Sequence, residues 1–269
     1  MKDNLYKIPD FKRIDPFLMS INSADNHWMY ISSTGCLTAG RGQAKYALFP
    51  YVTDDLLHQN ARYTGPSTHI IVEQSNKKYL WQPFSDQIES YKKEQNLYKN
   101  SLGNKIVFEE VNHSMGLTFL YSWQASSRYG FVKKTKLINH SEVKLNVKLI
   151  DGLRNILPAG LELRIQQEMS NLANAYKVSE CNPDYNYALY YMNALLMDKP
   201  DPGESLFSNM VWSFSEEKFE LSVNQKSINT FLNDQCFTGD LLIKGKEGSF
   251  LNYIEKSLDQ NHEMCWYIV

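Results

Sequence analysis

A two-residue alternation of apolar and polar side chains constrains the fold of this chain more than any other feature. Residues 143–150 show it most clearly. Four apolar side chains occupy every second position and face one way: Val143, Leu145, Val147 and Leu149. The opposite face carries Lys144, Asn146, Lys148 and Ile150. A period of two predicts a β-strand with one buried and one solvated face, which is typical of antiparallel sandwiches and not of parallel α/β sheets.

Strand-like runs follow one another along most of the chain. They are rich in β-branched and aromatic residues and are bounded by turn residues, for example at 126–128 and 139–142. No repeat, low-complexity tract or Gly/Ser linker separates them, so we predict a single, mainly β sandwich domain over residues 1–269. The predicted strands are residues 28–31, 68–72, 78–81, 105–111, 115–123, 131–138, 143–150, 185–192, 207–214, 219–223, 240–243 and 264–269.

One segment departs from this rhythm. Residues 161–176 are rich in helix formers. Their apolar side chains recur at spacings of three and four: Leu161, Ile165, Met169, Leu172 and Tyr176. This predicts one amphipathic helix lying against a sheet. The Pro- and Gly-rich residues 198–203 predict a surface loop.

Composition limits the classes of partner. The 269 residues carry 28 Lys and Arg against 30 Asp and Glu, a formal net charge of −2. Such a balance argues against nucleic acid, because phosphate binding needs a clustered basic surface. The 17 tyrosines among the aromatic residues favour either an aromatic β core or surfaces that stack on sugars.

The cysteines and the N-terminus indicate the compartment. Four cysteines lie far apart without a C-x-x-C pair, which favours neither a disulfide scaffold nor a zinc site. Residues 1–7 lack the apolar run of a secretion signal, and no stretch is apolar enough for a membrane span. We therefore expect a reducing, cytoplasmic setting and no membrane partner. The apolar end at 264–269 suggests the front module of a longer protein, because such a free edge needs a neighbour.

No motif identifies a catalytic centre. The glycines at 40–42 and 239–245 fail the dinucleotide and phosphate-loop spacings, and no nucleophile elbow occurs. The histidines form no metal-binding pair, so we expect no metal ion or cofactor. Glycosidic chemistry needs two carboxylates across a cleft. Glu109 and Glu110 are adjacent in a strand and must face opposite ways, and we predict Asp54 and Asp55 in a surface loop. No catalytic residue is therefore assigned.

The first loop region, residues 41–63, holds the densest mixture of aromatic rings and polar groups in the sequence. Sugar recognition uses flat apolar rings together with planar bidentate groups. One interpretation makes this region a sugar-binding surface. The other places Tyr46, Tyr51 and Tyr63 in the core with the charges on its rim, and the sequence leaves both open. The candidate substrate-binding residues are Arg41, Asp55, Arg62, Tyr63 and Trp81.

Several segments carry a resemblance to a known family. The segments are residues 28–35 (WMYISSTG), 37–42 (LTAGRG), 60–63 (NARY), 81–84 (WQPF), 112–119 (NHSMGLTF), 136–141 (KLINHS) and 239–269. Their order resembles the N-terminal sandwich of cellobiose- and chitobiose-phosphorylase-type enzymes and their cyclic β-glucan synthetase relatives, glycoside hydrolase family ninety-four. The likeness is a faint pattern over residues 28–269, and residues 162–174 and 182–202 have no counterpart in it.

The resemblance implies a super-β-sandwich of the galactose-mutarotase-like class, followed by a helical linker and an (α/α)6 barrel that holds the catalytic carboxylate. The chain would then be a non-catalytic module of a glycoside phosphorylase or hydrolase that acts on β-linked oligosaccharides. Such a module packs on the barrel, helps the enzyme dimerise and lends loop residues to a sugar-binding cleft.

Two other functions stay open. The first is a complete mutarotase-like sugar epimerase that works through a His and a carboxylate on facing strands, with His69, His113 and Glu109 as its candidates. The second is a carbohydrate-binding protein with no enzyme attached.

Overall fold

The computed structural model describes residues 4–74, 77–85, 91–194, 206–234 and 236–269. Within them, 18 strands form three sheets, and every strand pairing is antiparallel. The mainly β, sandwich-type fold predicted from the alternation is confirmed. No helix in this part of the chain is both long and apolar enough to cross a membrane.

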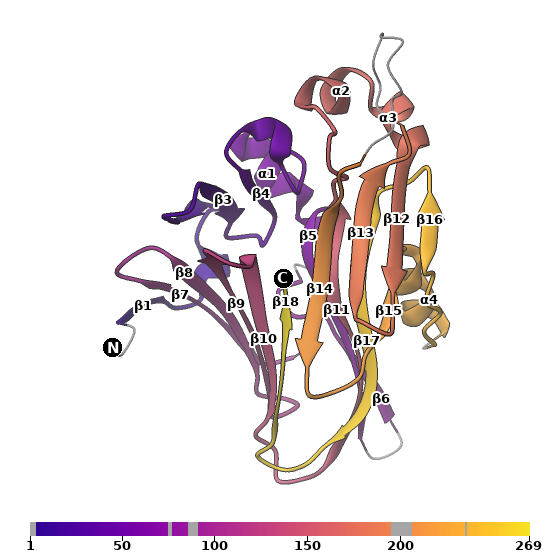
Figure 1. The fold of residues 1–269 in the computed structure, drawn as a ribbon. Helices are drawn as coiled ribbons and strands as arrows, with labels where there is room; N and C mark the ends of the chain where they lie inside the picture. The colour runs from indigo at the N-terminus through magenta and orange to yellow at the C-terminus, as the bar shows by residue number, and fades with distance from the viewer. Residues whose placement is uncertain (1–3, 75–76, 86–90, 195–205, 235) are drawn as a thin grey trace, which may run out of the picture.

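The largest sheet has ten strands and forms the front layer in Figure 1. Strands β8, β9 and β10 follow one another as antiparallel hairpins. The last strand of the chain, β18, lies between β10 and β14. In spatial order, its strands are β1 (Leu5–Ile8), β7 (Lys93–Asn100), β8 (Lys105–Asn112), β9 (Leu117–Ser126), β10 (Gly130–Asn139), β18 (Glu263–Ile268), β14 (Asn209–Ser215), β13 (Tyr187–Met192), β12 (Lys177–Asn182) and β16 (Leu242–Lys244).

Two smaller sheets complete the sandwich. The five-stranded sheet has the order β15 (Glu220–Ser222), β17 (Gly248–Leu258), β11 (Leu145–Ile156), β5 (Gly65–Gln74) and β6 (Lys77–Trp81). The three-stranded sheet has the order β2 (Leu18–Ile21), β3 (His27–Ser32) and β4 (Leu37–Arg41).

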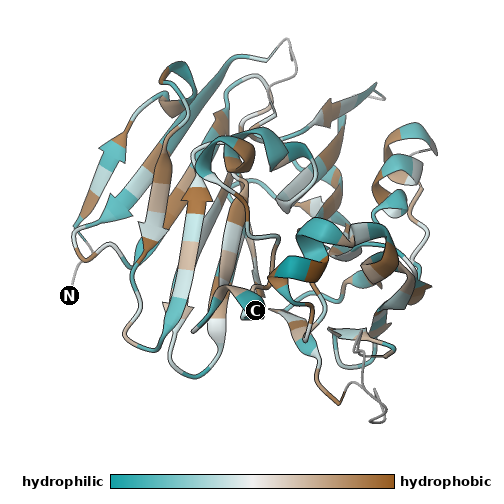
Figure 2. Cartoon of the chain, turned by 90° about the horizontal axis from the view of Figure 1, so that it is seen from above, coloured by the Kyte–Doolittle hydropathy of each residue, from teal (hydrophilic) through white to brown (hydrophobic). Residues whose placement is uncertain are grey.

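The main core lies between the ten-stranded sheet and the two smaller sheets. Alternation along β9 turns Phe119, Tyr121 and Trp123 inward, where they join Ile31 of β3 and Leu149 of β11 in one apolar cluster. The same alternation is visible as brown and teal residues along the strands in Figure 2. A core of this size stabilises the fold through the apolar area it removes from water.

Short helices decorate the sheets. They are α1 (Asp54–Gln59), α2 (Leu163–Glu168), α3 (Ser170–Tyr176) and α4 (Lys226–Asp234), with 3-10 turns η1 (Phe11–Arg13), η2 (Ala44–Tyr46) and η3 (Asn60–Arg62). Helix α4 covers the outer face of the five-stranded sheet, because Ile228 and Phe231 pack against Ile71 of β5 and Ile150 of β11.

The single helix predicted at 161–176 is wrong. The segment forms α2 and α3, and the backbone between them breaks at Met169, whose φ is −135°. The break rotates the apolar stripe, so Ile165 and Tyr176 pack against a small core while Met169 and Leu172 are exposed. Local periodicity does not reveal such a break, because it depends on what each half packs against.

Several boundaries also differ from prediction. The strand predicted at 143–150 begins later and ends later: β11 runs from Leu145 to Ile156, and Val143, which was expected on the buried face, is exposed. Asp54 and Asp55 begin α1 and do not lie in a loop. The alternation pattern did not predict β1, β2, β4, β7, β12 and β17. The loop predicted at 198–203 lies outside the described residues.

Candidate functional site

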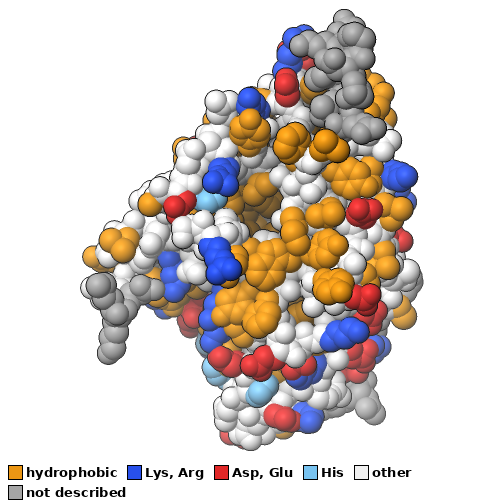
Figure 3. Space-filling model, viewed as in Figure 1, with side chains coloured by type: hydrophobic (Ala, Val, Ile, Leu, Met, Phe, Trp, Pro, Cys, Tyr) orange, Lys and Arg blue, Asp and Glu red, His pale blue; other side chains and the backbone are white. Residues whose placement is uncertain are grey.

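A groove opens at one end of the sandwich, between the ten-stranded sheet and the two smaller sheets. The ends of β4, β9, β10, β11 and β14 form its walls together with Val269, and its volume is about 660 Å³. That volume falls within the usual range for small-molecule sites. A hollow bordered by hydrophobic side chains is visible on this side of the molecule (Figure 3). We call this cavity the mouth groove, and its aromatic lining is Tyr46, Phe49, Trp123, Tyr129 and Phe131.

The mouth groove combines open rings with unsatisfied polar atoms. Tyr46 and Tyr129 are 56% and 51% exposed. Trp123 is buried, yet its Nε1 has no hydrogen-bond partner, and the same holds for Nδ1 of His27. Burial and the nearby charge of Arg41 lower the pKa of His27, so its ring is neutral at pH 7. Because buried polar groups normally have partners, these two atoms indicate capacity for a hydrogen-bonding ligand.

The mouth groove continues onto an uncovered apolar surface. On the outer face of β13, β14 and β18, Tyr187 lies opposite Trp212, and Phe214 lies opposite Tyr267. Tyr129 of the mouth groove packs edge-on against Trp212, with ring centroids 5.9 Å apart. Phe214 is more than half exposed. We call Tyr187, Trp212, Phe214 and Tyr267 the aromatic face. Exposed apolar surfaces of this kind mark interaction sites.

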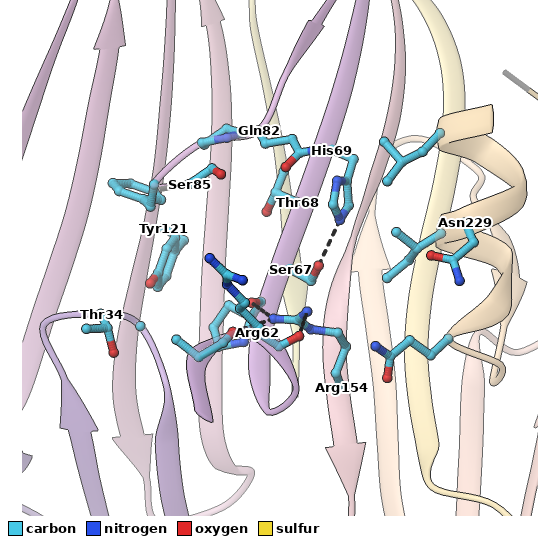
Figure 4. A pocket seen from close by; sticks show the side chains of 18 residues that line it. Thr34, Arg62, Ser67, Thr68, His69, Gln82, Ser85, Tyr121, Arg154 and Asn229 are labelled. Atoms are coloured by element: carbon cyan, nitrogen blue, oxygen red, sulfur yellow. Dashed lines mark hydrogen bonds between the residues drawn. The ribbon is translucent and has the colours of Figure 1, made fainter. Parts of the chain in front are cut away.

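A second cavity lies where strand β6 ends. Trp81 is the last residue of β6 and pairs with Ile70, so residues 66–69 of β5 have only β11 beside them among the described strands. A cavity of about 340 Å³ adjoins this free edge and is closed by η3, residues 82–85 and α4. We call it the edge pocket, and Figure 4 shows its side chains.

Arg154 of β11 anchors the base of the edge pocket. Its guanidinium donates to the carbonyl oxygens of Ala61 (2.7 Å) and Pro66 (3.3 Å) and to that of Arg62. Its Nε is buried and has no partner. Burial lowers the pKa of Arg154 to about 10, and among the described residues no carboxylate pairs with it. Among the described groups, carbonyl dipoles therefore stabilise the charge of Arg154. Burying a cation without a carboxylate partner costs free energy.

His69 lies above Arg154 on β5. Its Nε2 lies 3.0 Å from Oγ of Ser67, the contact drawn as a dashed line in Figure 4, and its Nδ1 is buried without a partner. Burial, with a smaller effect from the charge of Arg154, lowers the pKa of His69 to about 4. The imidazole is therefore neutral at pH 7, with one ring nitrogen able to serve a ligand.

A different charged group fills the interior behind the edge pocket. Lys133 of β10 and Asp151 of β11 are both fully buried and form an ion pair, with Nζ 2.7 Å from each carboxylate oxygen. Thr68 Oγ1 and Trp266 Nε1 also donate to Asp151, each at 2.7 Å. Burial lowers the pKa of Lys133, while the carboxylate of Asp151 opposes that effect. All members of this network face one another, so we assign it to the core.

The structure does not gather the five predicted site residues into one cluster. Arg41 lines the mouth groove, and Arg62 lines the edge pocket. Asp55 lies on α1, where its carboxylate accepts a 2.6 Å hydrogen bond from Thr53, and Tyr63 is 64% exposed. Neither Asp55 nor Tyr63 lines either cavity.

Trp81 is a core residue. Its side chain is fully buried, and its Nε1 donates to Glu110 at 2.7 Å because alternation along β6 turns the ring inward. Trp81 therefore has no place in an open binding surface. Tyr46, Tyr51 and Tyr63 are all at least 40% exposed, so the interpretation that packs these three in the core is wrong.

The sequence pattern does not single out several residues that line the two cavities. Trp123, Tyr129 and Phe131 belong to ordinary strand or turn patterns, and nothing local distinguishes them from core residues. Arg154 lies in the second half of β11 with two other polar residues, Asp151 and Asn155, so the sequence alone does not distinguish it. A charge at such a position indicates either a solvated edge or a site, and only the neighbouring strand decides between them.

The three candidates for an epimerase fall into two separate places. His69 lines the edge pocket, whereas His113 lines a shallow cleft of about 500 Å³ together with Glu109 and His140. His113 Nε2 lies 3.1 Å from Glu94. The prediction that Glu109 and Glu110 face opposite ways is confirmed, since they contact different partners on the two sides of β8. Across the described residues, no group of three His, Cys, Asp or Glu side chains is arranged to hold a metal ion.

Comparisons with known proteins find likeness among solved structures. No family model and no curated protein matches it. Among solved structures it is similar to a polysaccharide lyase (TM-score 0.45, 11% identity, 94% of this chain and 32% of that chain). It is also similar to 4-alpha-glucanotransferase from Thermococcus litoralis (0.38, 10%, 100% and 39%) and to a kojibiose phosphorylase from the human microbiome (0.32, 10%, 94% and 25%). The chain thus spans a quarter to two fifths of the length of these proteins.

Proposed function

We propose that this chain is the carbohydrate-binding sandwich of a carbohydrate-active enzyme, and that an oligosaccharide lies in the mouth groove and across the aromatic face. The observation that carries the proposal is the edge-on contact that joins the ring of Tyr129 in the mouth groove to Trp212 of the aromatic face. Trp123, whose buried Nε1 has no partner among the described residues, lines the same groove. Sugar rings present flat C–H faces to aromatic rings and hydroxyl groups to polar atoms, so one surface satisfies both.

The proposal is one of binding and not of bond cleavage. Hydrolysis of a glycosidic bond needs a pair of carboxyl groups at a fixed separation. None of the described residues that line the mouth groove is Asp or Glu, and Arg41 is its charged side chain. A guanidinium orients hydroxyl or carboxylate groups by bidentate hydrogen bonds and does not act as a general acid at neutral pH.

The class of the parent enzyme is a further part of the proposal. The resemblance of residues 28–269 to the N-terminal sandwiches of cellobiose- and chitobiose-phosphorylase-type enzymes supports a glycoside phosphorylase or hydrolase that acts on β-linked sugars. In that arrangement, a helical barrel in the same enzyme performs the catalysis. The sandwich holds part of the chain of sugars and contributes to assembly, including a homodimer.

Titration calorimetry with β-1,4-linked glucose oligosaccharides of increasing length tests the proposal. We expect saturable binding that strengthens with length, because a longer chain reaches from the mouth groove to Trp212. Trp212→Ala and Tyr129→Ala should each weaken binding about two- to ten-fold, the usual contribution of one aromatic contact. Tyr6→Ala is the matched control, since Tyr6 is 67% exposed on β1 at the far edge of the same sheet.

Unchanged affinity in both ring variants, or no saturable heat with any chain length, would contradict the proposal. Thermal unfolding of each variant checks that the sandwich is intact, so that a loss of binding reports the missing ring.

An epimerase is the second candidate, because Glu109, His113 and His140 line the same shallow cleft. A His and a carboxylate within reach of one sugar could exchange protons with its ring oxygen and anomeric hydroxyl. Polarimetry of glucose or galactose anomers measures this activity directly. A His113→Asn variant that matches the native rate, whatever that rate is, removes this candidate.

A further inference from the structure

The edge pocket concentrates positive charge without a described counter-charge. Arg62 and Arg154 both line it, and no Asp or Glu is among its described lining residues. Neither arginine forms an ion pair with a described residue. Figure 4 shows the two side chains next to each other at one end of the pocket, below Ser67 and His69. Two adjacent guanidinium groups repel each other unless an anion lies between them.

The hydrogen bonds of Arg154 also position Arg62. The Arg154 guanidinium donates to the carbonyl oxygens of Ala61 and Arg62, the last two residues of η3. Because the backbone of Arg62 is held in this way, its exposed side chain starts from a fixed point at the rim. One cation is therefore fixed at the base of the cavity and a second can close over it, an arrangement that preorganises the site.

The free edge of β5 supplies the remaining polar groups. Alternation puts Ser67 and His69 on the outer face, toward α4, while Thr68 turns inward to Asp151. His69 Nδ1 and Arg154 Nε are both buried, and neither has a partner among the described residues. Two orphaned polar atoms in one cavity are unusual in a folded protein, and a bound ligand would satisfy them.

We propose that the edge pocket binds a small polar molecule through an oxyanion, either a carboxylate or a phosphate, clamped between Arg62 and Arg154. Guanidinium groups match both anions through paired hydrogen bonds. The volume of about 340 Å³ suits a ligand of the size of one sugar unit. Ser67, His69 and Asn229 of α4 then face the uncharged part of the ligand. This site is separate from the mouth groove and does not depend on the function proposed there.

Calorimetry at low ionic strength with four probes tests the proposal: glucuronate, glucose 6-phosphate, inorganic phosphate and glucose. We expect saturable binding of at least one anion and none of glucose. Glucuronate alone would identify a carboxylate site, and glucose 6-phosphate or inorganic phosphate would identify a phosphate site. Added salt should weaken the binding. Failure of all three anions, or binding of glucose with equal affinity, overturns the proposal.

Two variants with the same change of charge sharpen the test. Arg62→Gln should weaken binding of the anion at least about ten-fold, because it removes a charged hydrogen-bond donor and leaves intact the backbone carbonyl that Arg154 binds. Arg13→Gln is the control, since Arg13 is a highly exposed residue of η1. Equal affinity of Arg62→Gln and Arg13→Gln contradicts the site.

A second readout follows from the neighbourhood of His69. Arg154 of β11 is the charged group that acts on the pKa of His69, and Arg62 of η3 lines the same pocket. A bound anion offsets both, so the imidazole resonances should report a higher pKa of His69 when the anion is present. A pKa of His69 that does not move at saturating anion places the binding elsewhere and overturns the assignment.

Discussion

The two faces of the β5–β11 strand pair carry their charges in opposite ways. On the inner face, Lys133 and Asp151 are fully buried and form an ion pair. Thr68 and Trp266 donate further hydrogen bonds to the carboxylate of Asp151. On the outer face, Arg154 has carbonyl oxygens as its acceptors, and its Nε remains unpartnered. Asp151 and Arg154 are three residues apart on one strand, so strand alternation alone sends them to opposite sides.

The comparison distinguishes charges that stabilise the core, those of Lys133 and Asp151, from the charge of Arg154, which is available to a ligand. Both carboxylate oxygens of Asp151 accept hydrogen bonds, and the network locks the ten-stranded sheet to the five-stranded sheet. The outer charge lies beside a cavity and a free strand edge, where a ligand can reach it. The difference shows that burial of a charge does not by itself mark a functional site; incomplete partnering beside open space does.

The largest effect is expected from breaking the inner pair. Lys133→Met leaves the carboxylate of Asp151 buried without a cation, and we expect the free energy of unfolding to fall by about 3–5 kcal/mol. The double variant Lys133→Met/Asp151→Asn removes both charges and should recover part of that loss. Urea denaturation followed by tryptophan fluorescence measures both. A double variant as unstable as the single one would show that the charge pairing does not matter.

An intermediate effect is expected from pH at the outer face. The pKa of His69 is about 4 in the folded protein and near 6.5 when unfolded. The unfolded state therefore binds the extra proton between these values, and stability must fall as the pH drops from about 6.5 toward 4. The slope from this group is at most about 1.4 kcal/mol per pH unit. The His69→Gln variant should show a shallower dependence by up to this amount in denaturation series at several pH values, and identical slopes would contradict a neutral His69.

The smallest effect on stability is expected at the rim of the edge pocket. Arg62→Gln should change the free energy of unfolding by no more than about 0.5 kcal/mol, because the Arg62 side chain is exposed and has no described ion-pair partner. The same variant should lose most of its affinity for an oxyanion. Thermal and urea unfolding measure the first quantity. If Arg62→Gln strongly lowered the free energy of unfolding, Arg62 would have a structural role like that of Lys133.

Much of the fold follows from local pattern. The strands at 105–111, 115–123 and 131–138 were predicted nearly to their ends, because each alternates regularly and is bounded by turn residues. Strand β7 was missed because polar Gln95 and Asn96 occupy its buried positions. Those side chains are tolerated inside because Glu110 and Glu109 accept their hydrogen bonds, a fact that concerns the neighbouring strand and not β7 itself.

The candidate sites were predictable only in part. The cluster of rings and planar cations in the first loop region points to Arg41 and Arg62, and each of them lines a cavity. They line different cavities, however, since the chain between them passes from β4 through α1 to η3. Trp81 follows this cluster in the sequence, but the alternation of side chains along β6 turns its ring into the core.

By itself, the sequence determined that the chain alternates, that it forms antiparallel sheets, and that its balanced charge does not favour nucleic acid. These are local or summed properties, and a strand of period two expresses them wherever it lies. Only the tertiary structure decided that β6 stops opposite Ile70, that Arg154 meets η3 across the free edge of β5, and that Tyr129 reaches Trp212. The contacts of Arg154 with η3 and of Tyr129 with Trp212 join residues far apart in the chain. No local pattern encodes such distances, because they arise from the order in which the strands pair.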